Sequence, residues 1–486
     1  MLLIADRKPA AAARVKAAVM SLSPALPAGN ASRAVFSRRS FFKTLAAAGA
    51  GAVVAPSLLS ARNQNSRLQI ACVGVGGRGA GNVSEMHRET HGSEKYLAFC
   101  DVNSGTLAKQ SAQFKVPHSY ADYRELLDKH AKELDAIFIG TLDHTHGIIA
   151  CDAMSRGIHC YCEKPLARTV WENRQMARWA ASKKLCTQTG TQVRSWGRDA
   201  SAHYYRGIEM VRAGVIGDIA EVHVWCDGTY VPKTEPTGSD PVPSWLNYDL
   251  WLGPTPAHPF NKAWLSFSKY GFWHSGCGMI AGMGPHTIDL AWTALNLAPP
   301  TEIEILAQPL PPSPLYNRDN LHVVFTHPRT AGGTGAGSAA AGKPIKLHWY
   351  DAKQRPAGIA KDLADLKHPA GVLFVGERGN IQVHYGYHKF FPAPKFAGAN
   401  VPRIYPNTVG HHRQWLEAIK AGKPEQCECR FEYAAHYTEA ITLAALLHRT
   451  GGTKLAWNSA ALTTDNAAVN ALLRPQFRDG WKFPEA

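Results

Sequence analysis

A glycine-rich run between an apolar segment and a helix pattern limits the fold of this chain more than any other feature. Residues 74–79 read Gly-Val-Gly-Gly-Arg-Gly and directly follow the apolar residues 68–73. Glycines at this spacing permit a tight turn and let the backbone approach a pyrophosphate at the N-terminus of the next helix. We therefore predict that a dinucleotide is bound by Gly74, Gly76, Gly77, Arg78 and Gly79. The alternative is a glycine-rich turn with a purely structural role.

An acidic residue ends the next apolar segment. Asp101 lies 22 residues after Gly79, and no arginine follows in residues 102–103. A carboxylate in this place accepts hydrogen bonds from the ribose hydroxyl groups of NAD and repels the 2′-phosphate of NADP. The sequence therefore favours NAD as the cofactor over NADP, with Asp101 among the residues that bind it.

Short apolar segments and helix patterns alternate from residue 66 to residue 188. After the first segment, strands are predicted at 95–100, 134–140, 158–162 and 185–189, and helices at 123–132, 148–156 and 170–183. Thr169 and Glu172 have the spacing of a capping box at the start of the last helix. Alternation of this kind is typical of a parallel doubly wound sheet, so we predict an α/β protein with a Rossmann domain at 66–188.

The pattern changes after residue 190. Longer, more alternating segments follow at 219–225, 302–307, 321–325, 345–350, 371–375 and 380–383. They predict a C-terminal α+β domain at 189–455 with a large, mostly antiparallel open sheet, followed by a tail at 456–486. Residues 225–273 carry many tryptophans and prolines and are predicted to form a long ordered loop, and the low-complexity residues 330–344 a flexible hairpin tip.

The N-terminal residues have the pattern of a twin-arginine export signal. Residues 37–45 read Ser-Arg-Arg-Ser-Phe-Phe-Lys-Thr-Leu, and an alanine-rich run follows to about residue 61. This bacterial route carries folded proteins, often with a redox cofactor bound. We predict that residues 1–64 are a leader and signal, that the protein works in the periplasm or cell envelope, and that it has no stable membrane insertion after processing. A membrane helix or an amphipathic start is the alternative, but the run is too short and glycine-rich to span well.

The composition of the chain argues against a nucleic-acid partner. The net charge is +15, yet no basic block with interleaved aromatic residues is present, so we predict no nucleic-acid partner.

Ten cysteines are present. None forms a Cys-x-x-Cys pair, although 160/162 and 427/429 are Cys-x-Cys pairs. We interpret them as buried structural thiols and predict no metal site, a metal site being the alternative.

Two short motifs carry residues suited to proton transfer. Glu163-Lys164-Pro165 directly follows a predicted strand, at the sheet edge where ligands bind, and its lysine can hydrogen-bond a substrate hydroxyl group. The alternative is a surface lysine in a turn. His286 and Asp289 are three residues apart, which places them on one side of a helix. A histidine acts as acid or base near neutral pH, and the alternative is a capping or core histidine.

These motifs together resemble the glucose–fructose oxidoreductase, inositol dehydrogenase and MocA (Gfo/Idh/MocA) family over residues 66–455. The resemblance rests on the glycine turn, Asp101, Thr141 with His146, the Glu-Lys-Pro triplet and the Gly-x-His-x-x-Asp run. It implies that Lys164 is catalytic and precedes a cis-proline, that His286 is the acid/base histidine, and that Thr141, His146, Glu163 and Lys164 contact the cofactor. It also implies a homo-oligomer formed through the open sheet. Many members carry an aspartate four residues before this histidine, where this chain has Gly282.

The substrate side is consistent with carbohydrate, because aromatic faces pack against sugar C–H groups. We predict substrate contacts from Arg194, Trp196, Trp273, His286 and Asp289; for the tryptophans, a core position is the alternative. The first functional hypothesis is an NAD-dependent oxidoreductase that acts on a sugar, cyclitol or glycoside by hydride transfer at a secondary hydroxyl group. The alternatives are an NAD-recycling glycosidase or lyase that works by oxidation and elimination, and a non-catalytic sugar-binding protein.

Overall fold

The computed structural model describes residues 67–195, 200–308, 310–329, 343–356 and 368–486. All of them fall in one compact unit, Ala61–Ala486. The export signal, Trp196 and residues 330–342 of the predicted hairpin tip lie outside these ranges.

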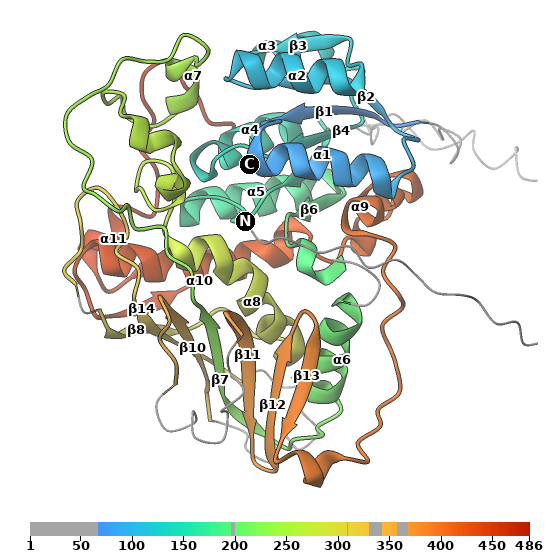
Figure 1. Cartoon of the computed structure of the whole chain (residues 1–486), viewed down its shortest axis with the longest axis vertical. Coiled ribbons are helices and arrows are strands. Elements are labelled where there is room, and N and C mark those ends of the chain that lie inside the picture. Colours follow the sequence, from blue (N-terminus) through green and yellow to red (C-terminus); the bar gives the residue numbers. More distant parts are fainter. Residues whose placement is uncertain (1–66, 196–199, 309, 330–342, 357–367) are drawn as a thin grey trace, which may run out of the picture. The chain divides into compact units, whose positions relative to one another are not determined.

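The first sheet has six strands in the order β3-β2-β1-β4-β5-β6, all paired in parallel (Figure 1). Its strands are β1 (Gln69–Val73), β2 (Lys95–Cys100), β3 (His118–Tyr120), β4 (Ala136–Ile139), β5 (His159–Cys162) and β6 (Thr187–Thr189). The connecting helices are α1 (Gly77–Glu89), α2 (Ser104–Phe114), α3 (Tyr123–His130), α4 (Asp143–Ser155) and α5 (Val170–Lys183). The predicted Rossmann fold is confirmed.

Local sequence explains why these elements form. The strands β1, β4 and β5 are almost wholly buried, as expected for a sheet covered by helices on both faces. The predicted capping box is present: Thr169 accepts a hydrogen bond from the Glu172 backbone N–H, and the Glu172 carboxylate accepts one from that of Thr169. Strand order reverses between β1 and β4, and this is the switch point at which doubly wound sheets bind ligands.

The second sheet has nine strands in the order β13-β12-β11-β7-β10-β9-β8-β14-β15. Its strands are β7 (Ile219–Cys226), β8 (Glu302–Ala307), β9 (His322–His327), β10 (Ile345–Asp351), β11 (Ala370–Gly376), β12 (Gly379–His384), β13 (Tyr387–Phe391), β14 (Lys454–Asn458) and β15 (Thr463–Thr464). Only the β10–β7 pair is parallel among the described pairs, which confirms the mostly antiparallel prediction. The sheet continues past the predicted domain end at residue 455, because β14 spans it.

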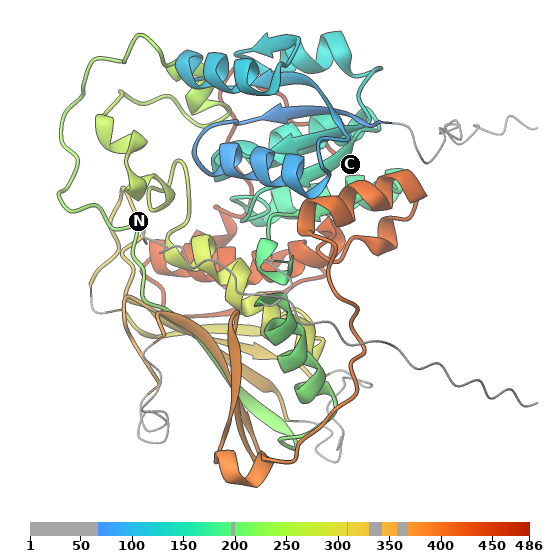
Figure 2. The same cartoon turned by 45° about the vertical axis from the view of Figure 1, so that its right-hand side comes forward.

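Helices cover one face of this second sheet (Figures 1 and 2). They are α6 (Ala200–Arg212), α8 (Met279–Leu295) and α10 (Phe431–Arg449), and α8 packs on β7 and β11. Two further helices, α9 (His411–Ala421) and α11 (Ala467–Asn470), lie near the C-terminal end of the sequence. No helix in the described ranges is both long and apolar enough to cross a membrane.

The tryptophan-rich loop is ordered, as predicted, and it packs against the first domain. It contains α7 (Tyr248–Leu252) and two short 3-10 helices, Lys262–Leu265 and Phe267–Tyr270. Its Asn247 N–H donates to the carbonyl oxygen of Val102 at 2.9 Å, just beyond the end of β2. Farther along the chain, the tail is tied to this loop, since Arg478 Nε donates to the Gly253 carbonyl oxygen at 2.6 Å. The loop and the tail therefore both lie beside the ligand-binding edge of the first sheet.

Candidate functional site

The glycine turn after β1 requires glycine at two positions. A Cβ atom on Gly74, where φ is +80°, would lie 2.6 Å from the carbonyl carbon of Gly140. A Cβ on Gly79 would lie 2.0 Å from the carbonyl oxygen of Gly74. The turn is thus pressed against the end of β4. Gly77 begins α1 at φ +51°, and a Cβ there would meet no atom within 4 Å, so the helix start is open to a ligand.

Asp101 holds its carboxylate directly against this turn. The carboxylate accepts hydrogen bonds from the backbone N–H groups of Val75 and Asn103, both at 2.9 Å. Burial raises the pKa of Asp101, and these N–H groups oppose that rise. A carboxylate has lone pairs beyond those used here, so it can still accept hydrogen bonds from ribose hydroxyl groups. The glycine cradle and this acid together fit a dinucleotide.

A cavity of about 370 Å³ joins the turn to the second domain. Its first-domain wall includes Gly74, Gly76, Gly77, Arg78, Asp101, Thr141, Asp143, Glu163 and Lys164. The tryptophan-rich loop contributes Trp245, Leu250 and Tyr270, and the tail contributes Trp481. Most of the residues predicted to bind the cofactor therefore line one cavity.

Lys164 reaches across the domain boundary. Its Nζ donates to the carbonyl oxygen of Gly282 in α8 at 2.9 Å. The Lys164–Pro165 peptide bond is cis, as the resemblance implied. The neighbouring Glu163 is buried, and its Oε1 accepts hydrogen bonds from Asn82 and Gln192, each at 2.5 Å. Glu163 therefore fixes the turn, while Lys164 faces the second domain.

His286 lies one helical turn after Gly282 in α8. Burial, followed by the positive charges of Lys164 and Arg78, lowers its pKa well below the usual value of 6.5. Its imidazole is therefore neutral near pH 7. In the described ranges its buried Nδ1 has no hydrogen-bond partner. A neutral ring with an unsatisfied nitrogen can exchange a hydrogen bond with a hydroxyl group.

A tyrosine fills the space beside Gly282. A Cβ on Gly282 would lie 2.4 Å from Cε2 of Tyr230 and 2.8 Å from its hydroxyl oxygen. Tyr230 is buried, and burial raises its pKa. An aspartate at position 282 would therefore collide with Tyr230. The tyrosine occupies the space that the aspartate side chain would need.

Asp143 is an acid of this site that sequence reasoning did not select. It lies in the first turn of α4, is 3% exposed and lines the cavity. Burial raises its pKa to about 7, while the nearby charges of Lys164 and Arg168 oppose the rise. One feature of the sequence could have indicated Asp143. It lies shortly after β4, and β4 ends at the same sheet edge as β5, the strand before Lys164.

Thr141 and His146 differ in their placement. Thr141 lines the cavity, and its Oγ1 accepts a hydrogen bond from Thr145 at 2.7 Å. His146 is buried, and its Nδ1 lies 2.8 Å from the carbonyl oxygen of Pro165. The histidine thus holds the Glu-Lys-Pro turn, and its direct contact with a cofactor stays a prediction.

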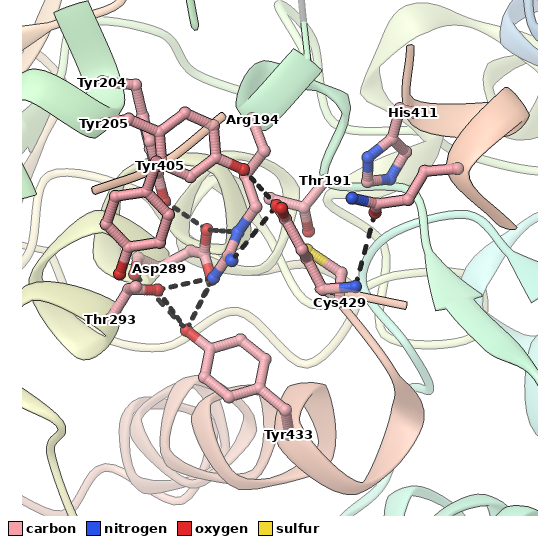
Figure 3. Close-up of polar contacts among 12 residues, drawn as sticks. Thr191, Arg194, Tyr204, Tyr205, Asp289, Thr293, Tyr405, His411, Cys429 and Tyr433 are labelled. Carbon is pink, nitrogen blue, oxygen red and sulfur yellow. Dashed lines mark hydrogen bonds and ion pairs between the residues drawn. The ribbon is translucent and has the colours of Figure 1, made fainter. Parts of the chain in front are cut away.

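Arg194 and Asp289 form a buried ion pair (Figure 3). Arg194 Nε and Nη2 donate to the two carboxylate oxygens of Asp289 at 2.8 and 2.7 Å. Tyr204 and Tyr433 also donate to this carboxylate, and Thr293 accepts from Nη2 at 2.5 Å. The pair joins the segment that follows the first domain to α6, α8 and α10, and neither residue is among those that line the cavity. Its predicted contact with substrate stays a prediction.

Trp273 is also placed in the core. It is 4% exposed, and its Nε1 donates to the carbonyl oxygen of Ser313 at 2.8 Å. The guanidinium group of Arg449 lies over its ring, 5.2 Å from the centroid. Its role toward substrate, like that of Trp196, stays a prediction.

Thiols and metals were the remaining sequence predictions. All ten cysteines lie in the described part of the chain and are buried free thiols, as predicted. Within that part, no group of three His, Cys, Asp or Glu side chains is arranged to hold a metal ion.

Two family models match the chain. Residues 68–191 match the NAD-binding Rossmann fold of an oxidoreductase family, and residues 217–309 match the C-terminal alpha/beta domain of the same family. Both models belong to the Gfo/Idh/MocA oxidoreductase family. The resemblance drawn from the motifs is thereby confirmed.

Curated relatives match part of the chain. Glycosyl hydrolase family 109 protein 2 of Akkermansia muciniphila is 30% identical over 188 residues, which are 36% of this chain and 37% of the relative. Levoglucosan dehydrogenase of Pseudarthrobacter phenanthrenivorans is 28% identical over 145 residues, 30% of this chain and 34% of the relative. The matches thus span about a third of these two relatives.

Solved structures show the same fold. Levoglucosan dehydrogenase in complex with NADH and levoglucosan superposes with a TM-score of 0.51 at 18% identity, covering 80% of this chain and 99% of that one. WlbA dehydrogenase from Bordetella pertussis, in complex with NADH and UDP-GlcNAcA, gives 0.51 at 14% identity, covering 81% and 99%.

Proposed function

We propose that this Gfo/Idh/MocA protein is an NAD-dependent oxidoreductase that acts on a sugar, cyclitol or glycoside. One observation carries the proposal: Lys164 of the first domain and the Gly282–His286 turn of the second meet beside the cavity that contains the glycine turn and Asp101. NAD would be held by that turn and by Asp101, and it would supply the hydride acceptor. The relatives with dehydrogenase names and the NADH complexes of the same fold support this choice.

The side chains at the domain boundary would orient a hydroxyl group of the substrate. The Lys164 ammonium has three donors, and only one is used by the Gly282 carbonyl oxygen. A free N–H of Lys164 can therefore hydrogen-bond the substrate oxygen. His286, neutral and with Nδ1 unsatisfied, can hold the same hydroxyl group from the second domain. Two fixed contacts on one oxygen define which carbon faces the cofactor.

The test is a survey of neutral and acidic sugars, cyclitols and glycosides with the purified, NAD-loaded protein. We expect at least one of them to generate the absorbance of reduced nicotinamide in the parent enzyme. Lys164→Met should bind NAD normally but lose most of that signal, and Lys129→Met, an exposed lysine of α3, is the matched control. A parent enzyme that binds NAD but reduces it with none of these compounds contradicts the proposal.

The glycosyl hydrolase names among the relatives favour a second candidate, redox-neutral cleavage of a glycoside. Oxidation at one carbon acidifies its neighbour, the aglycone is eliminated, and the hydride then returns. Aglycone release without net accumulation of reduced nicotinamide would select this reaction, whereas accumulation of reduced nicotinamide would select the dehydrogenase. A protein that binds sugar and does neither would be a non-catalytic binder.

We propose that the twin-arginine route exports the protein to the periplasm or cell envelope. The support is the pattern of residues 37–45, with its adjacent Arg38 and Arg39. Replacing both arginines with lysine keeps the charge and should leave the protein in the cytoplasm of a bacterial host. Unchanged export of that variant would contradict the proposal.

We also propose that the protein forms a homo-oligomer through the second sheet. The sheet face opposite α8 carries a separate cluster of Trp225, Tyr350 and Leu373, with His223 and His348 stacked beside it. Trp225, Tyr350 and Leu373 are themselves buried, and contact between copies of the chain would use the partly buried Val375 and Phe391 that pack against them. Light scattering should give a mass that is a multiple of the chain mass, and a monomer at all concentrations would contradict this.

A further inference from the structure

Oxidation of a hydroxyl group releases a proton that needs an acceptor, and this inference rests on the proposed function above. When CH–OH becomes C=O, the C–H bond breaks and its electron pair leaves with hydrogen as hydride to the NAD. The O–H bond also breaks, its electron pair forms the second C–O bond, and the proton leaves. The site must therefore hold one proton that the substrate has lost.

His286 is a poor place to keep that proton. Burial and the positive charges of Lys164 and Arg78 all disfavour an imidazolium ion there. Gly282 has no carboxylate, and Tyr230 fills the space in which one would lie. The second domain therefore offers no acid–base group at this turn that readily accepts a proton near neutral pH.

The first domain does offer such a group. Strands β4 and β5 are neighbours, and Ile139 is paired with Cys162. Asp143 follows Ile139 by four residues, and Lys164 follows Cys162 by two. Both residues line the same cavity, and the charge of Lys164 acts on Asp143. Asp143 is 3% exposed, so bulk water reaches its carboxylate poorly.

We propose that Asp143 accepts, through Lys164, the proton that leaves the substrate hydroxyl group. In the described ranges no hydrogen bond or ion pair joins Asp143 to Lys164, so the exchange runs through water in the cavity that both line. The hydroxyl proton passes to Nζ of Lys164, Lys164 passes one of its own protons to that water, and the water passes one to the Asp143 carboxylate, which becomes a carboxylic acid. Lys164 has the same charge before and after. Asp143 acts behind Lys164 and need not touch the substrate, and it takes the place of the carboxylate that position 282 lacks.

The surroundings of Asp143 suit this exchange. Burial raises its pKa to about 7, so that it takes up and releases a proton near neutral pH. The groups whose charges act on it or respond to it are Lys164, Arg168, Glu163, Tyr230, Tyr270, Cys162 and Cys277. Lys164 and Arg168 stabilise the carboxylate, Glu163 opposes it, and the phenols and thiols stay neutral because burial raises their pKa values.

The first test follows single-turnover NAD reduction against pH. In the parent the rate should rise with pH through about 7, as Asp143 loses its proton and becomes an acceptor. Asp143→Asn should lower the rate by about 10²-fold or more and abolish the rise, while Asp143→Glu should keep it. Asp152→Asn, in the same helix and paired with Arg156, is the matched control. Cofactor fluorescence should show that all variants bind NADH alike. An Asp143→Asn enzyme that keeps the parent's pH dependence overturns the proposal.

A second test needs no turnover. Infrared difference spectra between acid and alkaline pH should show a buried carboxylic acid band that disappears near pH 7 and is missing in Asp143→Asn. Lys164→Met should shift the midpoint of this band upward, because the charge that stabilises the carboxylate is gone. A midpoint that does not move shows that the two side chains are not coupled and overturns the proposal. If no sugar reduces NAD but the band shifts, the proposed function has failed and the Asp143–Lys164 coupling stands.

Discussion

Lys164 of the Rossmann domain and Gly282 of the second domain are joined by a hydrogen bond of 2.9 Å from Nζ to the backbone carbonyl oxygen. The contact places the Lys164 ammonium group against a turn of α8. The residue at this turn is glycine, so no carboxylate lies there. Because the acceptor is a backbone atom, no substitution at position 282 removes it directly. The lysine is thereby held at the domain boundary, one helical turn before His286.

Removal of Lys164 should affect chemistry far more than cofactor binding. Lys164→Met deletes the ammonium group that would hold the substrate oxygen, while the glycine turn and Asp101 remain. We expect single-turnover NAD reduction to slow by about 10²- to 10⁴-fold with NAD affinity nearly unchanged. His286→Ala should give a loss in the same range. Parent-like rates in either variant would show that the residue does not take part.

Gly282→Ala should destabilise the protein through Tyr230. The new Cβ would lie 2.4 Å from Cε2 of the tyrosine, so the ring or the helix must move. Overpacking of this kind costs about 1–3 kcal/mol in the free energy of unfolding. Urea unfolding measures it, and Gly81→Ala is the control, because a Cβ there meets only Arg78 Nη1 at 3.6 Å. In Tyr230→Leu the penalty of Gly282→Ala should shrink; an undiminished penalty would place the clash elsewhere.

Asp101→Asn should relax the choice between NAD and NADP. The amide keeps an oxygen that can accept from Val75 or Asn103 but loses the negative charge that repels a 2′-phosphate. Fluorescence titration should show weaker NAD binding and a smaller ratio of the NADP to the NAD dissociation constant. The exposed-charge control is Asp128→Asn, whose side chain is 68% exposed. An unchanged ratio would mean that Asp101 does not discriminate between the two dinucleotides.

Arg194→Met should be strongly destabilising. The substitution leaves the Asp289 carboxylate buried with only its tyrosine hydrogen bonds. Breaking a buried ion pair by removing one partner costs about 3–5 kcal/mol. Arg194→Met combined with Asp289→Asn should recover part of this loss, because no unpaired charge remains. If the double variant is no more stable than the single one, the pair is not the source of the loss.

The sequence predicted those parts of the site that depend on local spacing. The glycine turn begins, and Asp101 and Lys164 lie, within two residues after the end of a parallel strand, so the strand pattern places them at one sheet edge. The sequence did not predict contacts between segments that are far apart in the chain. Arg194 and Asp289 are 95 residues apart, and nothing in the sequence indicates that they form a buried ion pair; their contact with substrate stays a prediction. A polar residue near a site has the same sequence signature whether it binds a ligand or another side chain.

The walls that the loop and the tail add to the cavity were not predicted either, because they also depend on contacts between distant segments. The tryptophan-rich loop was expected to be ordered, but nothing in its composition indicates that Asn247 bonds to Val102 or that Trp481 of the tail lines the cavity. Asp143 was missed because an acid in the first turn of a helix is common for helix stability alone. Only its burial beside Lys164 distinguishes it.

That burial makes a prediction for stability against pH. The pKa of Asp143 is about 7 in the folded protein and about 3.9 in an unfolded chain. The folded state therefore binds this proton more tightly, so the stabilisation is complete below the unfolded pKa and is lost as pH rises through the folded pKa. Across pH 4 to 7 the free energy of unfolding of the parent should fall by up to about 4 kcal/mol through this group, at about 1.4 kcal/mol per pH unit.

Asp143→Asn removes the titration, so its unfolding free energy relative to the parent should rise over that range. Urea unfolding of both proteins at several pH values isolates the difference, because other buried acids such as Glu439 titrate in both. Parallel curves would show that the carboxylate is ionised throughout and would contradict the raised pKa.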